Sequence, residues 1–291
     1  MRPAADRARV DSHARVDSRA RAPDRASAAT PGLRLTVVGC AAAWSTRPGR
    51  ASSCYLVEIG DDALVLDMGQ GSFSQLAARR DPATLRGVLI SHAHADHCVD
   101  LVPFRHYVKH GRPGRPLAAP AVHGPVDLPS RFDDFAREPH LLAPFAFHAL
   151  ITGSLRIGPF DVKVERVAHV DRSFAFRVAR ARRTGERPGP PGLVYSGDCG
   201  DPSDLVPLIR PGDTLLAEAY WGAGPGDPAA NHLDAAGAAR AAREGAAARL
   251  ILTHLRDGVD PAAARRAARA VFEGEVLVAR PGLVVEIGQP G

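Results

Sequence analysis

The stretch His92-Ala93-His94-Ala95-Asp96-His97 places three imidazoles and one carboxylate within six residues. It follows the apolar run Gly87-Val88-Leu89-Ile90, which is typical of a buried strand. The polar side chains therefore lie in the turn at the carboxyl end of that strand, where a loop can direct all four toward one point. Imidazole and carboxylate together suit zinc and similar divalent ions, so the stretch predicts a metal site.

Three single polar residues each follow another apolar, strand-like run: His169, Asp198 and His254. Taken alone, each would be interpreted as an ordinary loop residue. The active sites of open α/β sheets gather at the carboxyl ends of strands. We therefore expect these three residues to join the stretch at 92–97 and to complete a site for two metal ions.

The rest of the chain alternates strand-like and helix-like segments. Strands are expected at residues 33–39, 55–59, 63–67, 85–91, 155–157, 160–167, 173–178, 192–196, 213–218, 248–252, 275–278 and 283–287. Helices are expected at about 69–80, 233–248 and 260–272, the second of them capped by Asp234. Residues 105–150 are expected to form a partly helical covering layer. This order, which begins with a mainly antiparallel meander, predicts a layered α/β domain.

Residues 1–32 contain seven arginines, four aspartates and almost no bulky apolar side chains. Such a segment cannot offset its ordering entropy by burial, so it is expected to be a disordered tail, or an over-long start, ahead of one domain at 33–291. The tail contributes a net charge of +3 to the chain's formal +5. The domain is therefore close to neutral, and its charge does not argue for a long nucleic acid as partner.

Composition also limits the cellular setting. No apolar run reaches the roughly 18 residues that a membrane-spanning helix needs, and the arginine-rich start lacks the apolar core of a secretory signal. The four cysteines show neither CxxC spacing nor the density of a disulfide scaffold. These features favour a cytoplasmic protein without a membrane partner.

The HxHxDH motif at 92–97, the later His169, Ser-Gly-Asp at 196–198 and Leu-Thr-His at 252–254 together resemble the metallo-β-lactamase superfamily over residues 33–291. The resemblance implies a four-layer αβ/βα sandwich with a dinuclear metal site between its halves. Zinc is the expected metal, with manganese as the alternative. Asp67 is implied as a support for the histidine loop that does not bind metal. The implied ligands form two sets bridged by Asp198: His92, His94 and His169, and Asp96, His97 and His254.

Within the superfamily, Ala217-Glu218-Ala219-Tyr220 and Asn231-His232-Leu233 resemble the RNase Z-like branch, and the chain as a whole is most similar to actinobacterial cyclic-nucleotide phosphodiesterases of that branch. The resemblance implies that His232 acts beside the scissile phosphate. We assign Asp96 to orient the attacking water and accept its proton, and Glu218 to orient His232. Two alternatives remain open: a histidine at a helix start without a role, and a structural ion pair for Glu218.

One feature departs from the tRNA-processing enzymes of this branch, which carry a long arm between the third histidine motif and the bridging aspartate. Here only 29 residues separate His169 from Asp198, and strands use most of them. We therefore expect a small phosphodiester substrate, foremost a 3′,5′-cyclic nucleotide. The alternatives are a ribonuclease that lacks the arm and a carbon-ester hydrolase acting on a lactone, thioester or β-lactam.

Weaker expectations concern the surroundings of the site. Trp44, Arg47 and Arg50 follow the first strand and are expected at the mouth of the site, where a base could stack on Trp44. Cys98 and Cys199 adjoin ligand positions but are expected to be packing residues. A homodimer is implied only by the resemblance.

Overall fold

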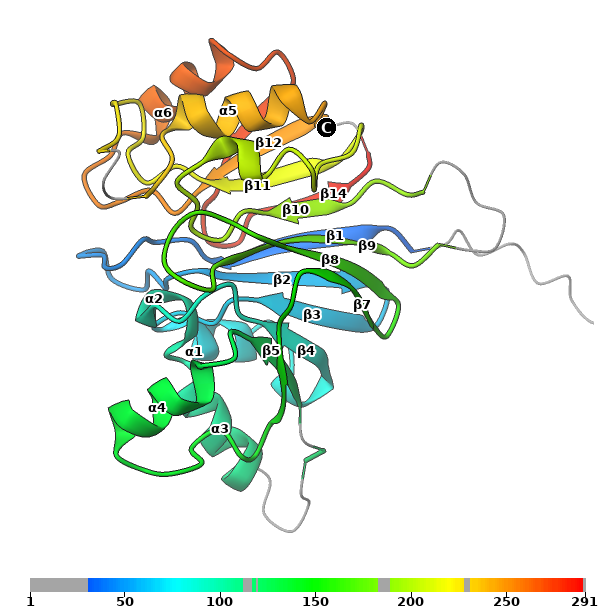
Figure 1. Ribbon diagram of the computed structural model, residues 1–291, viewed down its shortest axis with the longest axis vertical. Coiled ribbons are helices and arrows are strands. Elements are labelled where there is room, and N and C mark those ends of the chain that lie inside the picture. The colour runs from blue at the N-terminus through cyan, green and yellow to red at the C-terminus, as the bar shows by residue number, and fades with distance from the viewer. Residues whose placement is uncertain (1–30, 112–116, 119, 183–188, 228–230, 290–291) are drawn as a thin grey trace, which may run out of the picture. The chain divides into compact units, whose positions relative to one another are not determined.

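Two seven-stranded sheets form the framework of the protein (Figure 1). The computed structural model describes residues 31–111, 117–118, 120–182, 189–227 and 231–289. The predicted tail at 1–32 therefore lies, apart from its last two residues, outside the described residues.

The first sheet has the strand order β14-β1-β2-β3-β4-β5-β6 and the second the order β13-β12-β11-β10-β9-β8-β7. The strands of the first sheet are β1 (Leu33–Gly39), β2 (Cys54–Ile59), β3 (Asp62–Leu66), β4 (Leu85–Leu89), β5 (Ala121–Gly124), β6 (Ala146–Ala149) and β14 (Val284–Ile287). Those of the second are β7 (Gly153–Ile157), β8 (Phe160–Arg166), β9 (Phe174–Arg180), β10 (Leu193–Tyr195), β11 (Thr214–Glu218), β12 (Arg249–Thr253) and β13 (Glu275–Val278).

Helices cover the outer face of each sheet, as Figure 1 shows. The α-helices are α1 (Ser72–Ala77), α2 (Ala95–Cys98), α3 (Leu101–His110), α4 (Leu128–Ala136), α5 (Ala235–Glu244) and α6 (Pro261–Arg269), and two 3-10 turns lie at Pro82–Thr84 and Pro202–Asp204. One buried apolar cluster joins the first sheet to α1, α3 and α4, and another joins the second sheet to α5 and α6. The four layers confirm the predicted αβ/βα sandwich.

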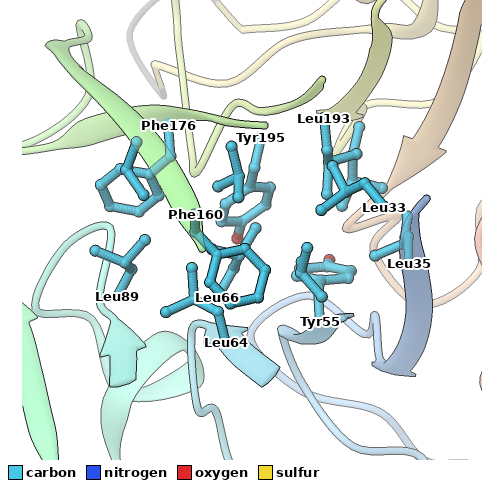
Figure 2. Close-up of a cluster of buried hydrophobic side chains, with 14 of the residues drawn as sticks. Leu33, Leu35, Tyr55, Leu64, Leu66, Leu89, Phe160, Phe176, Leu193 and Tyr195 are labelled. Atoms are coloured by element: carbon cyan, nitrogen blue, oxygen red, sulfur yellow. The ribbon is translucent and has the colours of Figure 1, made fainter. Parts of the chain in front are cut away.

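The space between the sheets is filled by a third apolar cluster, drawn in Figure 2. Leu64, Leu66 and Leu89 of the first sheet face Phe160 and Phe176 of the second. These side chains are fully or almost fully buried because alternate residues of each strand point toward the facing sheet. This packing sets the spacing between the two sheets, and with it the distance between the strand ends that carry the candidate site.

The chain begins with the predicted antiparallel meander, formed by β1, β2 and β3, and each sheet also has a parallel part. In each sheet three strand pairs are antiparallel and three are parallel: β3 to β6 run parallel in the first sheet and β10 to β13 in the second. Parallel neighbours need crossover connections, which helices usually supply. The turn at 92–97, Asp198 and His254 follow parallel strands, whereas His169 follows β8, which is antiparallel to both of its neighbours.

Two further expectations need correction. Residues 105–150 are not only a covering layer, because β5 and β6 from this segment extend the first sheet beside β4. The predicted helices at 69–80, 233–248 and 260–272 are real but shorter at their ends. At the end of α5, Ala246 has a φ of 56°, a left-handed conformation that terminates a helix.

Asp234 caps α5 as predicted, since its Oδ1 accepts a hydrogen bond of 2.6 Å from the amide of Gly237. The buried face of α5 consists of alanines and one glycine, and these small side chains let the helix lie close to the sheet. Of the helices in the described residues, none has the length and apolar character that crossing a bilayer requires.

Candidate metal centre

The turn after β4 brings its polar side chains together through a short helix. Ile90 and Ser91 continue the chain from β4, and His92 and His94 then precede α2, of which His94 is the N-terminal capping residue. Asp96 and His97 lie on α2 and are buried. The turn thus presents all four side chains to one region, as the sequence predicted.

One cluster contains His92, His94, His169 and Asp198. His94 Nδ1 lies 3.0 Å from His92 Nε2 and 3.3 Å from His169 Nε2. His169 lies in the link between β8 and β9, and Asp198 follows β10, so the second sheet contributes both. His94 is exposed to solvent and leaves this cluster open on one side.

A second cluster contains Asp96, His97 and His254, all buried. Asp96 Oδ2 lies 3.6 Å from His97 Nε2 and 3.7 Å from His254 Nε2. His254 follows β12 directly and has a φ of 54°, an uncommon conformation for a residue other than glycine. This bend turns the imidazole back toward the first sheet.

Asp198 lies between the two clusters and directs one carboxylate oxygen at each. Oδ1 is 3.2 Å from His97 Nε2 and 3.4 Å from His254 Nε2, whereas Oδ2 is 3.6 Å from His92 Nε2 and 3.7 Å from His169 Nε2. A carboxylate in this position can bridge two cations.

The donor atoms fit a pair of divalent ions. Ligands of one tetrahedral ion bound at about 2.1 Å lie about 3.4 Å from one another, close to the separations between these atoms. Two of the buried donors, His97 Nε2 and Asp198 Oδ1, have no hydrogen-bond partner among the described residues. Buried polar atoms are rarely left in that state, so these two atoms fit the role of cation ligands.

Metal binding needs neutral imidazoles and ionised carboxylates, and most of the pKa shifts run in that direction. Burial lowers the pKa of His92, His94, His169 and His254. His97 is the exception: burial lowers its pKa too, but the charges of Asp198 and Asp67 outweigh burial and hold that pKa well above its usual value. Burial raises the pKa of Asp198, but the surrounding imidazoles, His254 and His97 above all, outweigh it and hold that pKa well below its usual value.

Asp67 supports the turn from behind without reaching the clusters. Its Oδ1 accepts a hydrogen bond from the Ser91 amide at 2.7 Å. Its Oδ2 accepts hydrogen bonds from the Ser91 hydroxyl, His97 Nδ1 and the Tyr195 hydroxyl at 2.6–2.7 Å. Since His97 donates from Nδ1, the lone pair on its Nε2 is free to face a cation. Asp67 therefore has the place expected of it from the sequence.

Other histidines have similar partners. His169 Nδ1 donates to the carbonyl of Asn231 at 2.9 Å, and the Ser53 hydroxyl lies 3.1 Å from His254 Nδ1. Each contact fixes which ring nitrogen faces the cluster. Sequence reasoning missed Ser53 and Tyr195 in these roles. Neither stands in a polar motif that could have identified it: Ser53 precedes β2 and Tyr195 ends the apolar β10.

Glu218 and His232 form a pair beside Asp198. His232 Nδ1 donates to Glu218 Oε1 at 2.8 Å and lies 3.9 Å from Asp198 Oδ2. The ring of Tyr220 stacks on that of His232, with centroids 4.5 Å apart. Glu218 is fully buried at the end of β11 and also accepts the amide of Cys199 at 2.9 Å. The structure thus brings together both residues that the sequence singled out here.

The charges of this pair depend on each other. Burial lowers the pKa of His232, but the hydrogen bond and the charge of Glu218 outweigh it and raise that pKa overall. Burial raises the pKa of Glu218 to about 7, and hydrogen bonds from His232 and from the Cys199 amide oppose that rise. Both shifts favour a proton held within the pair, in the hydrogen bond between His232 Nδ1 and Glu218 Oε1.

The cysteines beside the ligands do not join the clusters that the described residues form. Cys98 Sγ donates to the carbonyl of His94 and Cys199 Sγ to that of Asp201, both at 3.1 Å. Burial raises the pKa of both thiols. The side chain of Trp44, which was expected at the mouth of the site, is 58% exposed in the loop after β1.

Comparison with known proteins places this geometry in a family. Residues 62–255 match the beta-lactamase superfamily domain. The chain is 32% identical over 269 residues to the protein ML1173 of Mycobacterium leprae, covering 89% of this chain and 90% of the relative. It is 31% identical over 306 residues to a ribonuclease Z of Myxococcus xanthus, covering 88% and 98% respectively.

A solved structure agrees with these relatives. The metallo-β-lactamase fold protein YhfI of Bacillus subtilis matches with a TM-score of 0.74 and 27% identity, covering 87% of this chain and 99% of that one. Its fold is the four-layer arrangement described above, and the histidine and aspartate clusters lie inside the matched residues 62–255. The chain therefore belongs to the metallo-β-lactamase superfamily.

Proposed function

We propose that this protein is a metal-dependent phosphodiesterase that binds two divalent ions, zinc foremost and manganese as the alternative. The observation that carries the proposal is Asp198, whose two oxygens face separate clusters of histidine and aspartate donors. The names of its relatives, a metallo-hydrolase and a ribonuclease Z, support the same class of reaction.

The proposed ligands are those of the two clusters. His92, His94 and His169 would hold one ion, Asp96, His97 and His254 would hold the other, and Asp198 would offer one oxygen to each. When bound, such a pair of ions supplies a water that ionises near neutral pH and compensates charge on phosphate oxygens. Asp96, at the side of the second cluster, orients this water and accepts its proton.

His232 is the proposed proton donor to the leaving oxygen. Its Nδ1–H is held by Glu218, so its other nitrogen, Nε2, is left to face the substrate. The raised pKa of His232 keeps a proton available for transfer. Glu218 acts through His232 and is a positioning residue. A lactone or thioester places no anionic phosphate beside His232, so this pair favours a phosphodiester.

The proposed substrate is small, most of all a 3′,5′-cyclic nucleotide. In the described residues between His169 and Asp198, the regular structure consists of β9 and β10, without a helical arm that could hold a tRNA. The ribonuclease Z relative supports a second candidate, cleavage of short single-stranded RNA. The four cysteines are free and buried, which is compatible with the proposed reducing cytoplasm.

The hydrolysis rate of cyclic AMP by the purified, metal-loaded protein tests this proposal. We expect turnover in the native protein and its loss, by about 1000-fold or more, in Asp96→Ala and Asp198→Ala. The matched control is Asp61→Ala, an exposed aspartate in the turn between β2 and β3. Its activity should equal that of the native protein.

The other outcomes separate the alternatives. Full activity of Asp96→Ala or Asp198→Ala toward the diester would refute the mechanism. Cleavage of short RNA without turnover of cyclic AMP would favour the ribonuclease. Hydrolysis of a lactone or thioester that survives His232→Ala would favour a carbon-ester hydrolase.

A further inference from the structure

A pocket of about 220 Å³ adjoins the candidate metal centre on the far side of His254. It is formed by the loop after β1, the residues that follow β12, and the end of β13. Its volume is below the roughly 300–1,000 Å³ of sites that enclose a drug-sized ligand. A pocket of this size suits one small group of a larger molecule.

The charge of this pocket is strongly positive. Four arginines line it, Arg47, Arg50, Arg256 and Arg280, against the single carboxylate of Asp257. Arg47 Nε lies 3.9 Å from Asp257 Oδ1. Arg50 and Arg280 form no ion pair within the part of the chain that the structure describes. Hydrogen bonds from Thr46 and the charges of Arg47 and Arg50 lower the pKa of Asp257, so four guanidinium groups share one carboxylate in this pocket.

Contacts between the loops hold this pocket in shape. Asp257 Oδ2 accepts hydrogen bonds from the amide and the hydroxyl of Thr46, at 3.2 and 2.7 Å. Ala41 forms bridges to both Ser52 and Leu255, and so joins the start of the β1 loop to the residue after His254. The arginines are thus carried on loops that are tied to each other.

The pocket and the metal centre share His254. This residue lines the pocket, while its Nε2 lies 3.4 Å from Asp198 Oδ1 in the second cluster. Arg256, two residues further on, has its guanidinium over the ring of Trp221, 4.9 Å from the centroid. His254 is therefore common to the arginine pocket and the candidate metal centre.

We propose that this arginine pocket binds a second phosphate group of the substrate, next to the scissile one. Guanidinium groups bind phosphate oxygens in paired hydrogen bonds, which favours phosphate over other anions of this size. The inference rests on the proposed phosphodiesterase function and refines its substrate class. Short phosphorylated oligonucleotides are bound more tightly than 3′,5′-cyclic mononucleotides, which have one phosphate.

The test compares Arg50→Gln, Arg280→Gln and the double variant with native protein, all metal-loaded. The control is Arg269→Gln, which removes the same charge from an exposed position at the end of α6, outside the pocket. The first readout is calorimetric titration with inorganic pyrophosphate. We expect the double variant to lose at least about tenfold in affinity, and the control to lose none.

The second readout compares kcat/KM for the dinucleotide ApA with that for pApA and ApAp, which carry one more phosphate at either end. Native protein and Arg269→Gln should prefer one phosphorylated form by about tenfold or more, mainly through KM, and the double variant should lose this preference. Loss of both the preference and pyrophosphate binding supports the proposal.

Two results would overturn it. Unchanged pyrophosphate affinity in the double variant would exclude an anion pocket. Weakened pyrophosphate binding without any preference in the native protein would mean that the pocket takes a free phosphate or pyrophosphate, not part of the substrate. If no phosphodiester is hydrolysed, the proposed function fails, and the calorimetry still decides whether the pocket binds phosphate.

Discussion

The two halves of the candidate metal centre are built in different ways. Residues 92–97 supply four donors from one turn, whereas the second sheet supplies His169, Asp198 and His254 singly, each at the end of a different strand. One carboxylate, Asp67, supports the turn through Ser91 and His97 together. Mutation of a residue that supports the turn should therefore disturb several metal donors. Mutation of a residue that supports one strand end should disturb only the donor at that end.

The largest effect is expected from Asp67→Asn. Asparagine tolerates the left-handed backbone at this position, where φ is 57°, so the change tests hydrogen bonding and charge. Its amide would face donors from Ser91, His97 and Tyr195 and leave at least one unpaired. We expect affinity for both metals to fall about 100-fold and the free energy of unfolding of the metal-free protein to fall by about 2–4 kcal/mol.

Metal titration and urea unfolding measure these two losses. Asp61→Asn, in the exposed turn between β2 and β3, is the matched control and should change neither quantity. If Asp67→Asn weakened the binding of only one ion, the turn would not act as a unit, and the contrast between the halves would be wrong.

A smaller and more local effect is expected from Ser53→Ala. This change removes the hydroxyl 3.1 Å from His254 Nδ1 and leaves the partners of the other histidines in place. We expect affinity for one ion to fall about tenfold and affinity for the other to stay the same, measured by stepwise metal titration. Ser130→Ala on the exposed face of α4 is the control. Equal weakening of both ions would contradict a local effect.

The helix caps of the second half allow a finer test. Asp234→Ala and Asp260→Ala each remove a cap, from α5 and α6 respectively, and each should lower the free energy of unfolding by about 1 kcal/mol. Only α5 begins directly after His232. We therefore expect reduced kcat in Asp234→Ala and native kcat in Asp260→Ala, with native metal content in both. Equal kcat in the two variants would show that the start of α5 does not position His232.

The smallest effect is expected from His123, near the edge of the first sheet, and it concerns the dependence of stability on pH. The rings of His123 on β5 and His148 on β6 stack with centroids 4.8 Å apart. Burial, with a smaller contribution from His148, lowers the pKa of His123 from 6.5 to about 4. Between these values the unfolded chain binds more protons than the folded one, so this site makes stability fall as the pH falls from 6.5 to 4.

Replacement of His123 by glutamine should remove part of this fall in the free energy of unfolding at low pH. The part removed is roughly 1 kcal/mol at most, because solvent screens the charge of this half-buried ring. Urea unfolding at pH 7 and pH 5 measures it. His106→Gln, on the exposed face of α3, is the control. An unchanged pH dependence in His123→Gln would show that the edge pair does not affect stability.

The accuracy of the sequence predictions follows the same contrast between local and distant structure. The turn at 92–97 and the cap at Asp234 depend on neighbours within a few residues, and both were predicted. The strands β5 (Ala-Val-His-Gly) and β6 (Ala-Phe-His-Ala) were missed because they have only one β-branched residue between them, whereas β13 and β14, strands of the same length, have two and three. β5 joins the sheet by pairing with β4, and β6 joins it by pairing with β5, and local sequence does not contain this pairing.

The amino-acid sequence by itself determined the superfamily, the layered fold and the kinds of donor available, because these follow from side-chain chemistry and from spacing along the chain. Only the tertiary structure decided that Asp198 divides its oxygens between two clusters, that Ser53 contacts His254 and Tyr195 contacts Asp67, and that four arginines line a pocket beside His254. These arrangements arise where strand ends from the two sheets approach each other, and that approach is set by the apolar packing between the sheets.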